Sequence, residues 1–146
     1  MVKFPEISEQ EVHARIDTGA NTSAVWASEV ELKDGVLSAC FFSKGHPAYT
    51  GKKVTFHEYS ETIVASSSGH AEHRFKVKVL VNIAGRKIRA RFTLADRSSQ
   101  AYPVLIGRNV LRGKFLVDVK RGTPLTVAEK ARSQQLQSKL TERGEV

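Results

Sequence analysis

The residues whose types and spacing best fit a chemical task are Asp17, Thr18 and Gly19, which directly follow a short apolar run. An aspartate held at a tight turn can face a second carboxylate with a water molecule between them. Two carboxylates that share a proton have separated pKa values, so one activates the water as a general base while the other polarises the reacting carbonyl as a general acid. Gly19 lets the backbone turn closely around Asp17 and offer it an N–H, and the Thr18 hydroxyl can brace the loop from inside. The motif therefore predicts hydrolysis by a carboxylate pair.

The elements that would position Asp17 are short strands. Apolar runs separated by Gly, Pro, Ser and Asp recur along the chain, with no long helical periodicity between them, and this pattern predicts an all-β fold. A short helical turn is expected at residues 108–112. The expected strands are residues 12–16, 35–42, 53–56, 62–65, 74–81, 86–94, 104–106 and 115–119.

The composition changes after Val119. A capping-box pattern from Thr126 to Glu129, followed by a run of helix formers, predicts a C-terminal helix. We therefore divide the chain into a β domain, residues 1–119, and a linker with a helical extension, residues 120–146.

Positive charge is concentrated in the second half of the chain. Residues 1–73 carry 6 basic and 10 acidic side chains and residues 74–146 carry 17 and 5, so the two halves have net charges of −4 and +12. Much of the excess lies in a predicted β-hairpin with its turn near Ala84 and Gly85. Alternation predicts an apolar inner face, formed by Phe75, Val77, Val79, Val81, Ile88, Ala90, Phe92 and Leu94, and an outer cationic ladder, formed by Arg74, Lys76, Lys78, Lys87, Arg89 and Arg91. The ladder is either a solvated face or a surface that meets an acidic partner.

In combination these segments resemble a known family. Residues 16–25 (Ile-Asp-Thr-Gly-Ala-Asn-Thr-Ser-Ala-Val), 64–74, 93–111 and 113–119 are similar to the bacterial retropepsin-like proteins of the RimB type, a group also labelled ATP-dependent zinc proteases. The resemblance covers most of residues 12–119.

The resemblance implies a retropepsin-like closed β-barrel with a homodimeric active site, to which each subunit contributes Asp17, Thr18 and Gly19. It also suggests a link to ATP-grasp ligases that add glutamates to protein tails. Residues 66–70 occupy the place where such enzymes keep a flap over the substrate, although an ordinary solvated loop is the alternative. The expected substrate-binding residues are Ala20, Asn21, Ser66, Ser67, Ser68, Gly69, His70 and Arg108, the last with structural support as an equal alternative.

A count of aspartates supports the dimer independently. The chain has one Asp-Thr-Gly, and Asp34, Asp96 and Asp118 are followed by neither Thr-Gly nor Ser-Gly. A carboxylate pair would therefore have to be built across a two-fold axis. A length of 146 residues is also too short for both lobes of a two-lobed aspartic protease.

Other chemistries fit less well. His57-Glu58 is not followed by a second histidine at helical spacing, and His70 and His73 supply too few ligands, so we expect neither a metal nor a cofactor. Cys40 lies in an apolar strand pattern and is expected in the core. A single cysteine closes no internal disulfide, and no signal peptide or membrane-spanning run is seen, so a cytoplasmic location without membrane association is expected.

Two functions from different classes remain. The first is a homodimeric aspartic endopeptidase that acts on a peptide or protein substrate, such as a glutamate-rich tail. The alternative is a non-catalytic basic β-barrel domain that binds an anionic partner, such as the ribosome or an acidic protein, with nucleic acid less favoured.

Overall fold

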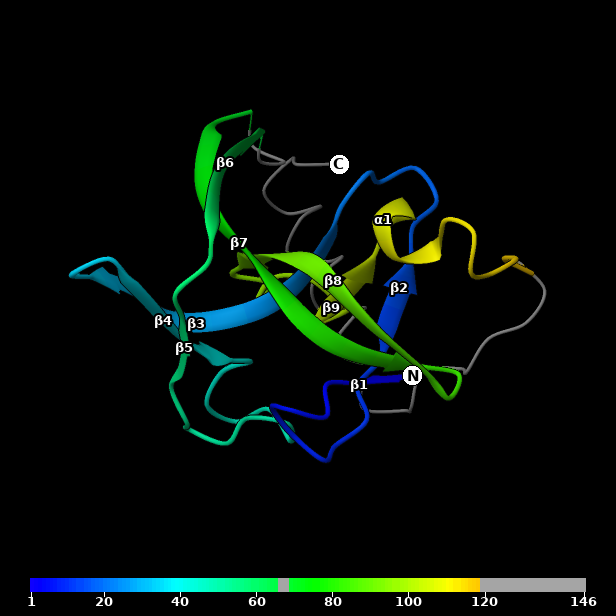
Figure 1. The fold of residues 1–146 in the computed structure, drawn as a ribbon, viewed down its shortest axis with the longest axis horizontal. Helices are drawn as coiled ribbons and strands as arrows, with labels where there is room; N and C mark the ends of the chain where they lie inside the picture. Colours follow the sequence, from blue (N-terminus) through cyan, green and yellow to red (C-terminus); the bar gives the residue numbers. More distant parts are fainter. Residues whose placement is uncertain (66–68, 119–146) are drawn as a thin grey trace, which may run out of the picture.

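The computed structural model describes residues 1–65 and 69–118 of the chain. In this part the chain forms strands and one short helix (Figure 1). The elements are β1 Val2–Lys3, β2 Ala14–Ile16, β3 Ser23–Lys33, β4 Val36–Phe41, β5 Val54–Phe56, β6 Ser60–Ala65, β7 Ala71–Ile83, β8 Arg86–Ala95, β9 Val104–Ile106 and α1 Arg108–Leu111.

The hairpin of β7 and β8 is the longest pairing in the molecule, and it confirms the predicted hairpin. Its register runs from Lys76 opposite Thr93 to Ile83 opposite Arg86. The two residues between the strands, Ala84 and Gly85, have φ values of 52° and 79°. Positive φ at both positions is the geometry of the two-residue turns that match strand twist. The predicted inner face is largely buried, with Val77, Val79, Val81, Ile88, Phe92 and Leu94 in the core.

Strand β3 joins two parts of the sheet and is, with the two-residue β1, an element that the sequence pattern missed. Its inner half pairs with β8 in parallel and with β9 antiparallel, and its outer half pairs with β4. The register shifts between Ser28 and Glu31, where Glu29 has a φ of 52°. Because the inner half is buried and the outer half is exposed, neither half alternates with period two.

The expectation of a closed barrel is wrong. The strands follow the order β1-β7-β8-β3-β4-β5, with β6 added to β7 and with β2 and β9 added beside β3. Within the described residues β1 and β5 end this path and do not pair with each other. The irregularity in β3 bends the strand where its pairing passes from β8 and β9 to β4.

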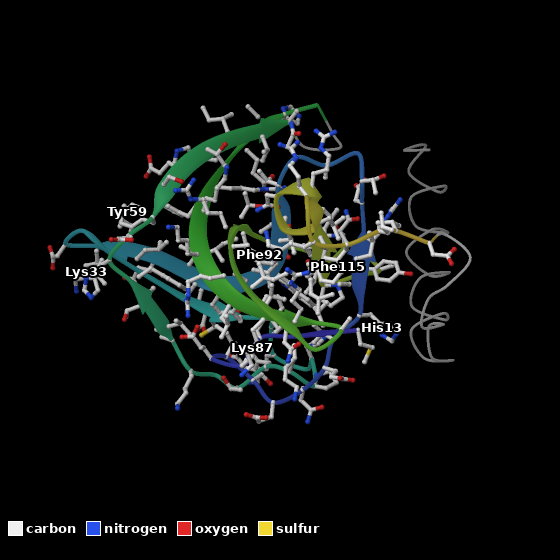
Figure 2. The ribbon with its side chains drawn as sticks, turned by 45° about the vertical axis from the view of Figure 1, so that its right-hand side comes forward. His13, Lys33, Tyr59, Lys87, Phe92 and Phe115 are labelled. Atoms are coloured by element: carbon white, nitrogen blue, oxygen red, sulfur yellow. The ribbon has the colours of Figure 1, made fainter. Side chains whose placement is uncertain are left out.

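The core lies between the inner face of β7–β8 and the strands around β3. Phe4, Phe42 and Phe92 are fully buried, and the rings of Phe4 and Phe92 meet edge to face at 5.5 Å. Phe92 lies near the centre of the molecule, whereas Lys33 marks the outer tip of the β3–β4 hairpin (Figure 2). Cys40 is 1% exposed, as expected for a core residue.

Beyond α1 the chain departs from the prediction. The amides of Lys114 and Phe115 both donate to the Leu111 carbonyl, at 3.0 and 3.1 Å, which keeps the chain turned. Residues 115–118 consequently form no strand, and the predicted strand at 115–119 is wrong there. The predicted C-terminal helix in residues 120–146 lies outside the described residues. No helix in residues 1–65 and 69–118 is long and apolar enough to cross a membrane.

Candidate active site

Asp17 lies where β2 ends, and its position is set by pairing with β9. Ile16 pairs with Ile106 in parallel register, and the Asp17 amide donates to the Ile106 carbonyl at 2.9 Å. The Gly19 amide donates to Asp17 Oδ1 at 3.0 Å, and the Ala20 amide donates to the Asp17 carbonyl at 3.2 Å. A tight turn therefore fixes the orientation of the half-buried carboxylate, as the motif predicts.

The Asp17 loop, residues 17–22, rests on the start of α1 (Figure 1). The Arg108 amide donates to the Ala20 carbonyl at 2.8 Å, and the Asn109 amide donates to the Asn21 carbonyl at 3.2 Å. A Cβ at Gly107 would lie 2.4 Å from the Thr22 carbonyl oxygen. Only glycine therefore allows the helix start to approach the loop this closely.

A buried hydrogen-bond network braces the loop from inside, and its main hydroxyl belongs to Ser23 rather than to the exposed Thr18. Ser23 Oγ accepts a hydrogen bond from the Gly107 amide at 2.9 Å and donates one to Asn109 Oδ1 at 2.8 Å. Asn109 Nδ2 in turn donates to the Arg91 carbonyl at 2.8 Å. We call Ser23, Gly107 and Asn109 the loop brace.

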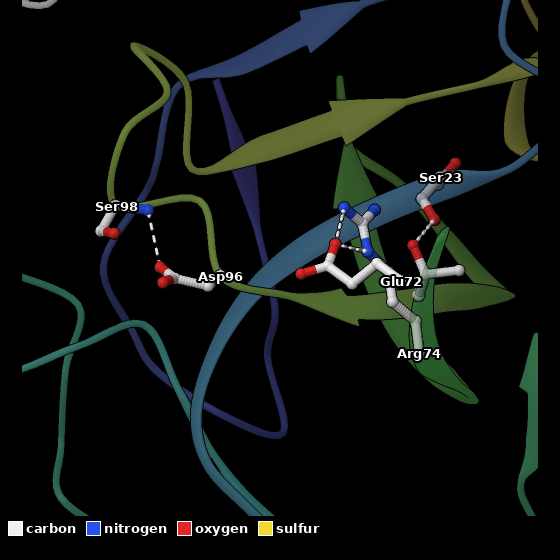
Figure 3. Close-up of polar contacts among 6 residues, drawn as sticks. Ser23, Glu72, Arg74, Asp96 and Ser98 are labelled. Atoms are coloured by element: carbon white, nitrogen blue, oxygen red, sulfur yellow. Dashed lines mark hydrogen bonds and ion pairs between the residues drawn. The ribbon is translucent and has the colours of Figure 1, made fainter. Parts of the chain in front are cut away.

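Thr93 adds a second buried hydroxyl beside the loop brace. Thr93 Oγ1 donates to the Ser23 carbonyl at 3.3 Å (Figure 3). Sequence reasoning named neither Ser23 nor Thr93. The available signal was a hydroxyl residue within a strand pattern that is otherwise apolar, because such a group must find a partner when it is buried.

Three of the expected substrate-binding residues are brought together at this loop. The Arg108 guanidinium donates through Nη2 to Asn21 Oδ1, and the Arg108 backbone contacts Ala20. Arg108 Nε is buried and has no hydrogen-bond partner among the described residues. The guanidinium is thus held by a neutral amide.

Of the other expected substrate-binding residues, the structure describes Gly69 and His70, which directly precede β7 in a hairpin that rises from the sheet (Figure 1). Strand β6 pairs with the first part of β7, from Ser60 opposite Lys76 to Ala65 opposite Ala71. Gly69, with a φ of 83°, and His70 are exposed near its end. The expected contacts at Ser66, Ser67 and Ser68 lie outside the described residues. We call residues 60–76 the β6–β7 hairpin.

A hollow of about 540 Å³ lies between the β6–β7 hairpin and the body of the molecule. Its walls come from β3, from the end of β8 and from the hairpin. The lining includes Trp26, Glu29, Glu72, Arg74, Phe75 and Asp96, but not Asp17. On this side Arg74 forms an ion pair of 2.6 Å with Glu72 (Figure 3). The hairpin therefore borders a space large enough for side chains of a ligand.

Arginine side chains gather beside this space. Burial lowers the pKa of Arg97, and the positive charges of Arg74 and Arg15 lower it further. Arg97 Nε donates to the Tyr102 carbonyl at 2.9 Å. Arg15 lies on β2, two residues before Asp17, which follows the end of that strand.

Two hydrogen bonds from Ser98, through its hydroxyl and its amide, lower the pKa of Asp96. The amide contact measures 2.9 Å (Figure 3). Asp96 thus remains ionised at neutral pH at the edge of the hollow. Within residues 1–65 and 69–118, no group of three or more His, Cys, Asp or Glu side chains is placed to hold a metal ion.

The Asp-Thr-Gly loop of this single-lobed β fold is braced by strand β9 and the short helix α1. This arrangement is typical of a retropepsin-like protein. The chain belongs to the RimB-like family, described as retropepsin-like aspartic endopeptidase RimB, whose family model matches residues 1–124.

Curated relatives match within a longer protein. The chain is 28% identical over 121 residues to a Shewanella pealeana protein and 29% identical over 121 residues to one from Shewanella halifaxensis, both named "Probable alpha-L-glutamate ligase". Each match covers 79% of this chain and 26% of the relative, so the chain spans about a quarter of their length.

A solved structure supports the fold. A Legionella pneumophila protein of unknown function superposes with a TM-score of 0.54 at 20% sequence identity. The match covers 75% of this chain and 79% of that one.

Proposed function

We propose that this chain is one subunit of a homodimeric aspartic endopeptidase in which each copy contributes Asp17. The observation that carries the proposal is the geometry of the Asp17 loop. The Asp17 carboxylate accepts a hydrogen bond from the Gly19 amide, and the loop backbone is held by the loop brace. The sequence has one Asp-Thr-Gly, so a dyad needs a second copy.

In the proposed mechanism the two Asp17 carboxylates share one proton across the two-fold axis. The ionised member takes a proton from a water molecule, which attacks the peptide carbonyl, while the protonated member donates to the carbonyl oxygen. The tetrahedral intermediate then collapses as the amine leaves with a proton. The Gly19 amide donates a hydrogen bond to Asp17 Oδ1 and so orients the carboxylate.

The proposed substrate is an acidic, glutamate-rich protein tail, which would lie between the β6–β7 hairpin and the body. Arg74 lines this space together with the carboxylates of Glu29, Glu72 and Asp96, and the charges of Arg97 and Arg15 lie close enough to interact with each other. Arg108 adds a positive charge at the Asp17 loop, beside Asn21. The names of the curated relatives support a functional link with a glutamate ligase, since a peptidase of this specificity would remove what such a ligase adds. Steering by these charges would make the catalytic efficiency fall as salt is added.

The test is cleavage of acidic and mixed peptide libraries by the wild type and by Asp17→Asn. We expect Asp17→Asn to lose at least about 10²–10⁴-fold in rate, because asparagine keeps the shape but cannot exchange a proton. Sedimentation should show that dimerisation is retained.

Asp34→Asn is the matched control. It removes the same charge from a turn where φ is 52°, a conformation that asparagine tolerates. Equal cleavage by Asp17→Asn and the wild type would refute the proposal, as would a protein that stays monomeric while it cleaves. The non-catalytic alternative, binding of an anionic partner, predicts binding by both variants and cleavage by neither.

A further inference from the structure

A second, smaller hollow lies on the outer face of the sheet, on the other side of β7 and β8 from the core. Its volume is about 260 Å³, and it lies where the chain enters β6 beside Tyr59 (Figure 2). Its lining consists of Glu58, Tyr59, Ser60, Lys76, Lys78 and Arg91. We call it the outer hollow.

The sheet register brings its three cations together. Lys78 is directly opposite Arg91, and Lys76 is directly opposite Ser60 on the other neighbouring strand. Lys76 and Lys78 share one face because they flank the buried Val77. Directly opposed residues have Cβ atoms about 4.5–5.5 Å apart, so the positive charges converge on one place.

These cations differ from Arg74 and Arg89, which lie on the same two strands. Arg89 forms an ion pair with Glu6 at 2.7 Å, and Arg74 forms one with Glu72 at 2.6 Å. Within the described residues the side chains of Lys76, Lys78 and Arg91 form no ion pair. Like charges opposite one another destabilise a sheet, so an anion that enters the hollow relieves a repulsion already present.

The donors and the charge balance define the kind of anion. Three cations and the carboxylate of Glu58 leave the lining with two net positive charges. A phosphate group carries about −1.5 to −2 charges at pH 7, with several acceptor oxygens on one centre. The guanidinium of Arg91, the two ammonium groups and the Ser60 hydroxyl are donors that such oxygens accept from.

The size and shape favour the same ligand. The volume lies below the roughly 300–1,000 Å³ of pockets for drug-sized ligands, which fits a compact group. An extended acidic peptide instead presents carboxylates on one side at intervals of about 6.6–6.8 Å, which spreads its charge along a groove. The edge-to-face contact of Tyr59 with Phe75, at 5.9 Å, fixes one wall of the hollow.

We propose that the outer hollow is a phosphate-binding site, separate from the Asp17 loop, that accepts either a free phosphate or a phosphate ester. The site shares Ser60 and Lys76 with the β6–β7 hairpin, but it includes no residue of the Asp17 loop and none that lines the larger hollow. Binding at the outer hollow therefore does not depend on whether the protein cleaves peptides.

The test is a titration of Asp17→Asn protein, which excludes cleavage, with inorganic phosphate at constant ionic strength, followed by amide NMR shifts. We expect saturable shifts at residues 58–60, 76–78 and 91. Lys76→Gln/Lys78→Gln/Arg91→Gln should bind phosphate at least about tenfold more weakly, because it loses three charge-assisted contacts. Lys78→Gln alone, expected to weaken binding severalfold, serves if the triple variant does not fold.

A control variant removes the same charge elsewhere. Lys33→Gln/Lys44→Gln/Lys52→Gln changes three exposed lysines outside the hollow. It should bind phosphate with the same affinity as the protein in which these lysines are unchanged. The proposal would be overturned if phosphate changed the amide NMR shifts no more than chloride does. It would also be overturned if the two triple variants lost phosphate affinity equally.

Two further ligands identify the source of the phosphate. A phosphoserine peptide that binds about tenfold more tightly than inorganic phosphate would assign the site to a phosphorylated protein, and equal affinities would assign it to a small phosphate compound. Hexaglutamate that binds more tightly than either would overturn the phosphate assignment in favour of a carboxylate site.

Discussion

The Asp17 loop and the β6–β7 hairpin belong to one candidate site but are held in different ways. The loop is tied to α1 through backbone hydrogen bonds and through the fully buried Ser23. In the hairpin, β7 pairs with β8 only from Lys76 onward, and Ile63 is 70% exposed. Its contact between His73 Nε2 and a Glu61 carboxylate oxygen, at 3.4 Å, is also solvent-exposed, and such contacts contribute little to stability. The Asp17 carboxylate is therefore fixed, whereas the β6–β7 hairpin costs little to move.

The largest expected effect comes from breaking the fixed side at Gly107. In Gly107→Ala the new Cβ would lie 2.4 Å from the Thr22 carbonyl oxygen and 2.9 Å from that of Ala20, both backbone atoms. We expect a loss of about 3 kcal/mol in the free energy of unfolding, measured in urea, together with loss of cleavage. Gly69→Asn, where nothing lies within 4 Å, should cost less than about 1 kcal/mol. Equal costs at the two positions would contradict the comparison.

Removal of the central hydroxyl of the loop brace should have the next largest effect. Ser23→Ala leaves the Gly107 amide and Asn109 Oδ1 without their shared partner in a buried site. We expect a loss of about 2 kcal/mol in the free energy of unfolding. Ser60→Ala, at an exposed position of β6, should change it by less than about 0.5 kcal/mol. A Ser23 variant as stable as the wild type would show that the brace is dispensable.

A pH titration tests a third buried group, the Cys40 thiol, which lies in the core and not in the β6–β7 hairpin. Burial, and then the Glu29 carboxylate that accepts the thiol hydrogen bond at 3.1 Å, raise the pKa of Cys40 above its usual 9.0. The neutral Cys40 thiol therefore contributes to the free energy of unfolding, and this contribution is complete below pH 9. It is lost as the pH rises through the raised pKa, because the thiol ionises at a lower pH in the unfolded chain than in the folded protein.

The measurement is the free energy of unfolding from pH 7 to 10 in the wild type and in Cys40→Ala. Above pH 9 the wild type should lose up to about 1.4 kcal/mol per pH unit more than the variant. Parallel curves for the two proteins would show that Cys40 has an ordinary pKa.

The smallest effect on stability is expected on the hairpin itself. Ile63→Ser changes a side chain that is already 70% exposed, so the free energy of unfolding should change by less than about 0.5 kcal/mol. If the hairpin contacts the substrate, the variant should raise KM while kcat stays within about twofold. A large loss of stability would show that the hairpin is packed as firmly as the loop.

The sequence was most informative where structure is local. The β7–β8 hairpin follows from alternation and from the Ala84-Gly85 turn, and Asp17 with Gly19 from a short motif. Strand β3 was missed because burial on both faces of one half and exposure of the other leave no period of two. The prediction of a closed barrel was wrong because the strand order depends on pairing between distant segments, which no local pattern reveals.

The candidate site follows the same division. The Asp17 turn was predictable from adjacent residues, but the loop brace joins Ser23 to Asn109, and only packing selects that pair. The position of Arg108 on Asn21 likewise depends on the meeting of two distant segments.

The separation of the two halves of the loop brace has a consequence for how the protein is made. Ser23 and Asn109 lie 86 residues apart, so closing this contact carries a large loop entropy and belongs to the slower events of folding. A growing chain exposes Asp17 early but has nothing to hold it until α1 has left the ribosome. The Asp17 loop would thus be assembled among the last parts of the β domain, so an unfinished chain would not hold this carboxylate in its final orientation.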